Sequence, residues 1–544
     1  MPTITISLSD LSRLVGVDLR DKFSEVAEYM KVEVNSITGD LAELEVTHDR
    51  PDYFSAEGIA RSVKGILGVE VGLPKLTIEE DYGLLKIGNV PQRPVIRMAL
   101  VEDVEIDEEA VRQLVQLQEK LHMTYGRDRA KFAIGLYDAD KVKFPLSYVN
   151  MPIDEVKYEP MDVGRVVTGR ELLTMVDKGV RYGKYALWNG MVPVLIDSSN
   201  VIHVVIPVLG SEYSRLTKGT RRVLIDVTGI DDAAVENALK VMAFAVAERS
   251  RSRVVKVLTP GSRSILEPRA IRVKVSDING ILGVDLSREQ VVDLLLKARY
   301  GVEVDGGELI VQVPPYRFLV IGPSDIAEDV AVAYGYNKLP RVYPTSRSMG
   351  RLMPLTKFAD MLANVLVTLG LQEVANYVLT SRSLMEAAGV EYYVDVLNPV
   401  SEKFNVVRSS IWPQLLNVIS QNRHLLPGRI KIFEVGRVVR GGDVLREEPL
   451  LAIAVSGPRV TLTDVLVVLN TLIAKLGAKP TYRHTNAKPY GIEGRFVEIL
   501  VNGNSVGIAF EVNPQVLINL GIDYPASVCE VNIRALWDSI HSIG

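Results

Sequence analysis

The sequence predicts a multidomain α+β protein. Its 544 residues correspond to roughly three to four domains of ordinary size. Hydrophobic residues make up 47% and charged residues 24% of the chain, which is the balance of a globular protein. Segments with the alternation typical of strands occur between segments with helical spacing. This composition excludes wholesale disorder, a collagen-like repeat and a disulfide-rich miniprotein.

The charge balance and the single cysteine further limit the kinds of protein that this chain can be. The chain carries 62 Lys and Arg against 67 Asp and Glu, so contact with a nucleic acid requires a local basic patch or a partner. Cys529 alone permits neither an intrachain disulfide nor a thiolate metal cluster, which predicts a cytoplasmic protein. The start lacks a secretory signal pattern, and no apolar stretch reaches the roughly 18 residues of a membrane span, so we expect no membrane partner.

Residues 1–84 form the first predicted domain, which mixes strands with helices. Residues 3–8 and 41–47 alternate between apolar and polar side chains, as strands do. Ser55 is expected to cap a helix that ends at Gly68, because Ser is favoured at the start and Gly at the end of helices.

Residues 85–262 form the second predicted domain, with many short strands. The apolar segments 191–196 and 203–208 predict two strands of a buried sheet, and 221–231 predicts another. Helical spacing resumes over 232–249.

Residues 265–345 predict a small module that resembles a winged helix. Ser287 and Gln290 have the spacing of a capping box at the start of a helix. Residues 302–313 predict a hairpin around an Asp-Gly-Gly turn. A last helix is expected over 325–334.

Residues 350–544 form the largest predicted α+β region, after a linker at 341–349 that contains Pro, Ser and Gly. Helical periodicity covers 355–371. Strands are expected at 429–434, 450–455, 496–501 and 505–511.

Common catalytic signatures are missing from the sequence. It has no P-loop, no strand–GxGxxG–helix, no HExxH and no GxSxG elbow. The six histidines are scattered singly, and Cys529 is expected to be a small core residue before a strand. These absences favour a scaffold or binding subunit over an independent enzyme.

Several motifs nevertheless occur in an ordered set along the chain. They are DRPDYFSAEGIARSVKGILG, GRDRAKFAIGLYDADK, VPPYR followed by PSDIAEDVAVAYGYN, then LGLQEVANYVLTS, LNPVSEKFNVVRSSIWPQLL and FEVG. With this set the chain resembles the β-subunit family of phenylalanyl-tRNA synthetase, of the archaeal and eukaryotic cytosolic type, over essentially its whole length.

The resemblance implies an (αβ)₂ heterotetramer that joins phenylalanine to its tRNA with ATP, at a site in the α subunit. For this chain it implies an α+β editing module at 85–262, a winged-helix-like module at 265–345, and a degenerate class II synthetase-like antiparallel-sheet domain at 350–544 that packs on α. Bacterial members carry two further domains, for which this chain has no room. Mg²⁺ and ATP, the latter used at the α subunit, are the implied cofactors.

The fourth region is expected to be an inactive copy of the synthetase fold. Arg408 and Glu434 resemble residues that hold ATP and amino acid in active copies. The later segment GIAFEVNPQVLINLGI lacks the arginine that active copies place against the ATP phosphates, which removes a charge-assisted contact. We therefore expect Arg408 and Glu434 to be structural, with a residual nucleotide site as the alternative.

The second region is expected to hydrolyse tRNA mischarged with tyrosine. A polar group that recognises the extra hydroxyl would make a second site selective, because an apolar pocket alone discriminates it poorly. The alternative is that Asp-Ser-Ser is a turn and Asp226 a strand-end cap. With no obvious nucleophile near except His203, hydrolysis would use a positioned water. The candidate pocket residues are Leu195, Asp197, Ser198, Ser199, Asp226 and Thr228.

The third region contains the candidate metal ligands. Asp325, Glu328 and Asp329 lie at i, i+3 and i+4, so a helix places their carboxylates on one face, and such oxygen ligands suit Mg²⁺. The alternative is that they cap the helix and interact with its dipole. The family implies a fourth acidic residue just after Tyr316-Arg317-Phe318, where this chain has Leu319.

Two groups of basic residues are candidates for contact with tRNA(Phe), or else for solvated faces. One group is Arg127, Arg129, Lys131, Lys218, Arg221 and Arg222, and the other is Arg249, Arg251, Arg253 and Lys256.

Two other functions compete with the synthetase β subunit. A non-catalytic nucleic-acid-binding or assembly scaffold would need a basic recognition helix, whereas the helix expected at 325–334 is acidic. A stand-alone hydrolase at 85–262 would need a complete catalytic constellation, and none is visible. The acidic helix and the missing catalytic constellation both favour the synthetase β subunit over these two functions.

Overall fold

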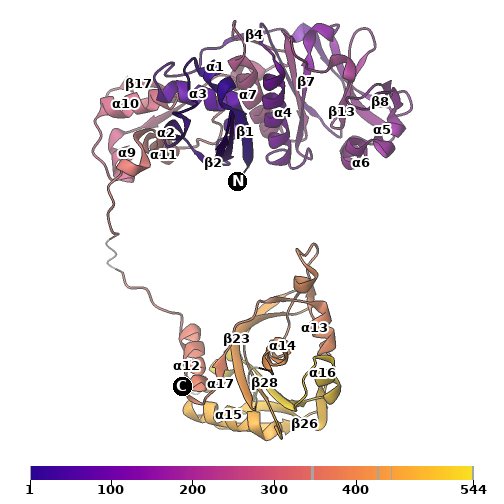
Figure 1. Cartoon of the computed structure of the whole chain (residues 1–544), viewed down its shortest axis with the longest axis vertical. Coiled ribbons are helices and arrows are strands. Elements are labelled where there is room, and N and C mark those ends of the chain that lie inside the picture. The colour runs from indigo at the N-terminus through magenta and orange to yellow at the C-terminus, as the bar shows by residue number, and fades with distance from the viewer. Residues whose placement is uncertain (1, 345–347, 425–427, 443, 542–544) are drawn as a thin grey trace. The chain divides into compact units, whose positions relative to one another are not determined.

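A computed structural model describes residues 2–344, 348–424, 428–442 and 444–541. The chain divides into two compact units, Met1–Tyr343 and Pro344–Gly544 (Figure 1). Part of the expected linker, 345–347, lies outside the described residues. Each unit contains both helices and strands, so the prediction of a mixed α+β chain with several sheets is confirmed.

The first unit begins with a three-stranded antiparallel sheet of order β1–β3–β2. The strands expected at residues 3–8 and 41–47 are present as β1 and β3. Ser55 does precede a helix, but its hydroxyl is buried without a hydrogen-bond partner among the described residues, so it is not a side-chain cap. The elements are β1 (Thr3–Ser7), α1 (Leu8–Val15), α2 (Phe23–Ala27), β2 (Val32–Thr38), β3 (Leu41–Val46) and α3 (Ala56–Ile66).

A five-stranded sheet of order β4–β15–β6–β14–β7 follows. Its β4 lies within the predicted first domain, yet it pairs in parallel with β15, 177 residues later in the numbering. Buried side chains of α4 and α7 pack with this sheet and with α1 and α3 in one apolar core. The elements are β4 (Thr77–Glu80), β6 (Val95–Val101), α4 (Glu108–Met123), β7 (Phe132–Asp138), β14 (Val223–Gly229), α7 (Asp232–Glu248) and β15 (Val254–Val257).

A second five-stranded sheet has the order β13–β12–β11–β8–β5. It lies with α5 and α6 at the end of the unit opposite α9 and α10 (Figure 1). The elements are β5 (Leu85–Ile87), β8 (Leu146–Pro152), α5 (Gly169–Met175), α6 (Asp177–Tyr182), β11 (Met191–Ile196), β12 (Ile202–Val205) and β13 (Leu209–Gly210). β9 (Lys157–Tyr158) and β10 (Val167–Thr168) form a separate two-stranded sheet, and α8 (Ser262–Ile265) contacts α7 and β4.

The last part of the first unit is a small helix-and-hairpin module with its own core. Ser287 and Gln290 form the expected capping box, and the expected hairpin turns at Asp305 to Glu308. The elements are β16 (Arg269–Val273), α9 (Val275–Leu282), α10 (Arg288–Lys297), β17 (Gly301–Asp305), β18 (Glu308–Val313) and α11 (Pro323–Tyr334).

The second unit is built on a seven-stranded sheet of order β19–β23–β24–β28–β27–β26–β25, antiparallel except at β19. Alternate residues of β24 enter two separate cores: Leu451 and Ile453 pack with α12, α15 and α17, whereas Leu450 and Ala452 pack with α14 and α16. Cys529 is buried within β28, not before a strand as expected.

All four strands expected in this unit are present, and each extends beyond its predicted bounds. A small sheet of order β20–β22–β21 accompanies them. The elements are α12 (Pro354–Thr368), β19 (Gln372–Glu373), β20 (Leu379–Thr380), α13 (Arg382–Ala387), β21 (Val394–Asp395), β22 (Val406–Val407), α14 (Trp412–Asn422), β23 (Ile430–Arg440), β24 (Arg446–Ser456), α15 (Leu462–Lys475), β25 (Pro480–His484), β26 (Gly491–Val501), β27 (Asn504–Val512), α16 (Pro514–Asn519), β28 (Ala526–Asn532) and α17 (Ile533–His541).

Candidate functional site

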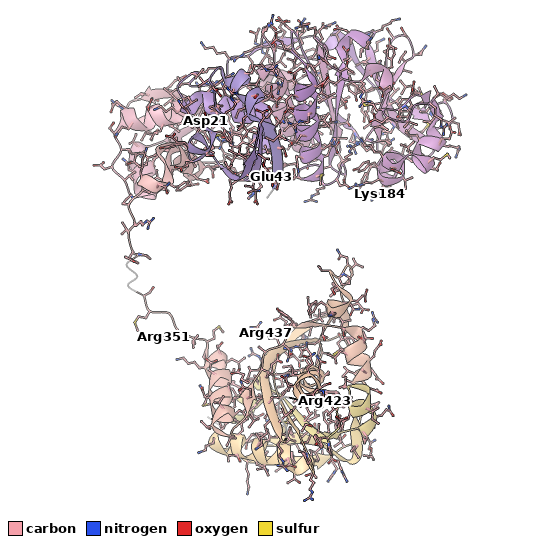
Figure 2. All side chains as sticks on the ribbon, viewed as in Figure 1. Asp21, Glu43, Lys184, Arg351, Arg423 and Arg437 are labelled. Carbon is pink, nitrogen blue, oxygen red and sulfur yellow. The ribbon has the colours of Figure 1, made fainter. Side chains whose placement is uncertain are left out.

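A cavity of about 200 Å³ lies in the first unit, where elements of its two five-stranded sheets meet. One wall comes from β7 and β14, another from the segment 204–210 around β12 and β13, and α4 contributes a third. Lys178 of α6 also lines the cavity. Figure 2 labels Lys184, which follows α6 in the chain. Two of the predicted pocket residues, Asp226 and Thr228, belong to this lining.

Asp226 is a buried carboxylate without a salt bridge to any described residue. It lies on β14, opposite Gly135 of β7, and is 2% exposed. The hydroxyl of Tyr137 donates to its Oδ1 at 2.6 Å. Burial outweighs this bond and the positive charge of Arg93, and it raises the pKa of Asp226 to about 6. The carboxyl group therefore changes charge close to neutral pH.

Gly135 provides the space in which Asp226 and Tyr137 meet. A Cβ atom at this position would lie 2.0 Å from the Tyr137 hydroxyl and 2.1 Å from Asp226 Oδ1, so these two groups would have to move. The close approach of the two polar groups thus depends on glycine in β7.

Thr228 lies two residues further along β14 and also lines the cavity. Its hydroxyl is buried and has no hydrogen-bond partner among the described residues. Its backbone carbonyl accepts from Arg93 Nη2 at 2.8 Å, and Arg93 itself is 1% exposed. Thr228 therefore presents a polar group whose hydrogen bond is left for a ligand or a water.

The other predicted pocket residues lie outside the cavity lining. Leu195 is part of an apolar core. The Asp197 carboxylate accepts from the backbone N–H groups of residues 143, 199 and 201 at 2.9–3.2 Å. The Ser198 hydroxyl donates to the Lys143 carbonyl at 2.9 Å. Local hydrogen bonding makes Asp-Ser-Ser, including Ser199, a turn, which was the alternative interpretation.

His203 is buried next to Asp197, with 3.4 Å between His203 Nε2 and Asp197 Oδ2. Burial lowers the pKa of His203, so the ring is neutral at pH 7. It does not line the cavity.

Sequence reasoning missed Gly135, Tyr137 and Gln118 as cavity residues. The alternation of β7 carries a signal, since Gly135 and Tyr137 are two apart and share one face of the strand. The pairing of β7 with β14, which places this face beside Asp226, has no signature in the sequence.

Arg129, proposed above for tRNA, is a structural part of the cavity wall. It is 6% exposed, and its guanidinium donates to the carbonyls of Pro207 and Val208 and to Glu119. It ends a run of three left-handed residues that begins at Arg127, with φ of 48°, 53° and 65°. The structure uses Arg129 to hold α4 against the β12–β13 segment.

The second basic run is also paired internally. Arg249 is buried and contacts Asp10 and Glu57, which join the N-terminal part to the end of α7. Further pairs in the two groups are Lys131–Asp231, Arg222–Asp140, Arg222–Glu102, Arg251–Glu105, Arg253–Glu70, Lys256–Glu79 and Lys256–Glu102. Every member of the second group is therefore in an ion pair, whereas Arg127, Lys218 and Arg221 of the first group are exposed.

The Arg408–Glu434 pair in the second unit is closed to a ligand. The two groups are 2.7 Å apart, and both side chains are at most 3% exposed. Arg408 also donates to Gln414 Oε1 at 2.7 Å and to the carbonyl of Arg437 at 3.0 Å. Each of the three guanidinium nitrogens thus has an acceptor within the described part of the unit, and Arg408 is 1% exposed, so the group is not open to a phosphate.

The three carboxylates of α11 do not converge on one point. Asp325 accepts from the backbone N–H groups of Ile321 and Gly322 at 2.6 and 2.9 Å, as an N-terminal cap does. Asp329 is buried against Arg317 at 2.5 Å. No group of three metal-ligating side chains is found among the described residues, so this arrangement does not fit Mg²⁺ held by the α11 carboxylates.

Comparisons with known proteins agree with the resemblance. The phenylalanyl tRNA synthetase beta chain CLM domain matches residues 339–533, and the tRNA synthetase B5 domain matches 271–336. These matches define the class as a subunit of an aminoacyl-tRNA synthetase.

Curated relatives identify the particular family. The phenylalanine–tRNA ligase beta subunit of Pyrobaculum aerophilum is 40% identical over 98% of this chain and 100% of its own length. That of Methanocaldococcus jannaschii is 35% identical, with the same coverage. The chain belongs to the family of phenylalanine–tRNA ligase β subunits, of the archaeal type.

A solved structure supports the fold of the first unit. The N-terminal fragment of the phenylalanyl-tRNA synthetase β-subunit from Pyrococcus horikoshii aligns with a TM-score of 0.57 and 32% identity, over 61% of this chain and 99% of that fragment. In the described part of the present chain, no helix is long and apolar enough to cross a membrane.

Proposed function

We propose that this chain supports phenylalanylation of tRNA(Phe) in a cytoplasmic (αβ)₂ heterotetramer, and that its cavity hydrolyses tRNA mischarged with tyrosine. Aminoacylation, with ATP and Mg²⁺, is assigned to the α subunit, because Arg408 is bound within its own unit. The observation that carries the hydrolytic role is a buried carboxylate, Asp226, that has no salt bridge to a described residue and lies in a cavity of mainly apolar lining.

Tyrosine and phenylalanine differ by one phenolic hydroxyl, and Asp226 is suited to detect it. Above pH 6 the carboxylate is ionised and accepts a hydrogen bond from a phenol. Phenylalanine in the same position would supply no donor and would leave the buried carboxylate with the Tyr137 hydroxyl as its one hydrogen-bond donor among the described residues, which a polar site discriminates against. Asp226 therefore favours entry of the tyrosyl group.

Hydrolysis of the aminoacyl ester requires attack by water on the acyl carbon. The bond between that carbon and the ribose oxygen breaks, and the ribose oxygen takes up a proton. The described cavity lining contains neither Cys nor His, so we assign the attack to a water held by polar groups such as the Thr228 hydroxyl. Binding and orientation of the ester supply the rate increase.

Deacylation of Tyr-tRNA(Phe) by the reconstituted αβ complex tests the hydrolytic role. Asp226→Ala is expected to reduce this deacylation while phenylalanine charging by the complex continues. Equal losses of charging and deacylation would make Asp226 a structural residue.

Phenylalanylation assays test the division between subunits. Activity is expected only when this chain is mixed with an α subunit from the same source. Activity of the chain alone would contradict the assignment of the aminoacylation site to α, and no activity in the mixture would favour the scaffold.

A further inference from the structure

Three carboxylates from two parts of the first unit surround the ammonium group of Lys31. Lys31 lies just before β2, and its Nζ is 2.8 Å from Asp49 Oδ2, 3.0 Å from Glu328 Oε1 and 3.2 Å from Asp329 Oδ1. Its side chain is 7% exposed. The ammonium group donates a hydrogen bond to Asp49 and forms ion pairs with Glu328 and Asp329, so one cation serves three carboxylates.

The distances distinguish this arrangement from a metal site. Oxygen ligands lie about 2.0–2.1 Å from Mg²⁺, whereas the oxygens here stand at ordinary hydrogen-bond distances from a nitrogen atom. Asp329 has no carboxylate oxygen to spare, since Oδ2 accepts from Arg317 and Tyr300. Leu319 is apolar where a further acidic ligand was expected.

We propose that Lys31 takes the place of a divalent cation at this acidic cluster, so that the contact between the N-terminal part and the B5 region is independent of metal. Lys31 and Asp49 belong to the N-terminal part, and Glu328 and Asp329 belong to α11 of the B5 region. One covalently attached positive charge therefore joins the two parts, with Arg317 balancing the second oxygen of Asp329.

Replacement of the ammonium group tests the proposal. In Lys31→Met the three carboxylates lose their shared cation, so the urea midpoint of the full chain is expected to fall. Mg²⁺ or Ca²⁺ should then restore part of it, with a midpoint that rises with the logarithm of the metal concentration. For the wild type, MgCl₂ should act no differently from NaCl of equal ionic strength.

Lys64→Met is the matched control. Lys64 is also nearly buried in an ion pair, but it contacts a single carboxylate, Glu248, at 2.5 Å. Its variant should lose stability without any rescue by Mg²⁺.

Two results would overturn the proposal. One is a Lys31→Met variant that folds and is not stabilised by either metal beyond the effect on Lys64→Met. The other is a wild type that Mg²⁺ stabilises specifically and that loses this response in Glu328→Gln, a measurement that needs no Lys31 variant to fold.

Discussion

Two buried acidic side chains, Asp226 in the first unit and Glu434 in the second, have opposite surroundings. Glu434 contacts the guanidinium of Arg408 at 2.7 Å and accepts from Asn376 at 2.7 Å. Asp226 has one neutral hydrogen-bond donor and faces a cavity. Burial is nearly the same at both sites, so the local cation is what separates a structural carboxylate from one available for chemistry.

Removal of Arg408 should produce the largest effect, because it would leave Glu434 buried and uncompensated. We expect Arg408→Met to destabilise the second unit by about 3–5 kcal/mol. Urea unfolding followed by tryptophan fluorescence measures this, since Trp412 and Trp537 lie in that unit. Arg437→Met removes an exposed pair with Glu447 and is the control, with an expected change of at most about 1 kcal/mol. Similar small losses for both variants would remove the contrast between the two sites.

At Asp226, in contrast, replacing the charged group is expected to increase the free energy of unfolding. Its folded-state pKa of about 6 is above the ordinary value of 3.8, so the folded state binds the proton more tightly. Stability is therefore lost as the pH rises from about 4 through 6, and Asp226→Asn should stabilise the chain by up to about 3 kcal/mol at pH 8. The gain should disappear below pH 4, which pH-dependent urea unfolding would show.

The same Asp226→Asn variant should deacylate Tyr-tRNA roughly tenfold more slowly or worse, because the ionised acceptor is lost. In the wild type the preference for Tyr-tRNA over Phe-tRNA should weaken below pH 6, while the variant should show no such pH dependence. If Asp226→Asn is less stable than the wild type and deacylates at the same rate, Asp226 is a structural residue like Glu434.

Gly135→Ala tests whether Asp226 depends on the space around it as well as on its charge. The added Cβ would force apart Asp226 and Tyr137, at a cost of about 1–3 kcal/mol in unfolding free energy, and deacylation should fall with it. Gly280→Ala is the control. A Cβ atom at Gly280 would meet open space, so this variant should leave deacylation unchanged. Full deacylation by Gly135→Ala would show that the cavity rearranges freely.

The smallest stability change is expected for Thr228→Val. The hydroxyl has no partner to lose among the described residues, so the unfolding free energy should change by less than about 1 kcal/mol. Deacylation should nevertheless decrease, and Thr228→Ser should retain it. A large loss of stability would reveal an internal role for the hydroxyl.

Predictions from sequence succeeded where a few neighbouring residues carry the signal. The capping box of Ser287 and Gln290 and the hairpin after Gly301 depend on interactions within three or four residues, and both are present. The i, i+2 spacing of Asp226 and Thr228 on a strand likewise placed both on the cavity side. Leu195 packs in the same apolar core as the cavity residues Tyr137 and Val204 without lining the cavity itself, a difference that the sequence pattern does not carry.

The sequence by itself determined the class of fold, most of the elements, the family and the two residues that define the candidate site. Only the tertiary structure decided which charges meet. Lys31 contacts Glu328 and Arg249 contacts Asp10, although each pair is separated by more than two hundred positions in the sequence. Gly135 likewise pairs with Asp226 from the neighbouring strand. The physical reason is that helix caps and turns are local hydrogen-bond problems, whereas ion pairing and burial depend on chain segments that become neighbours only on folding.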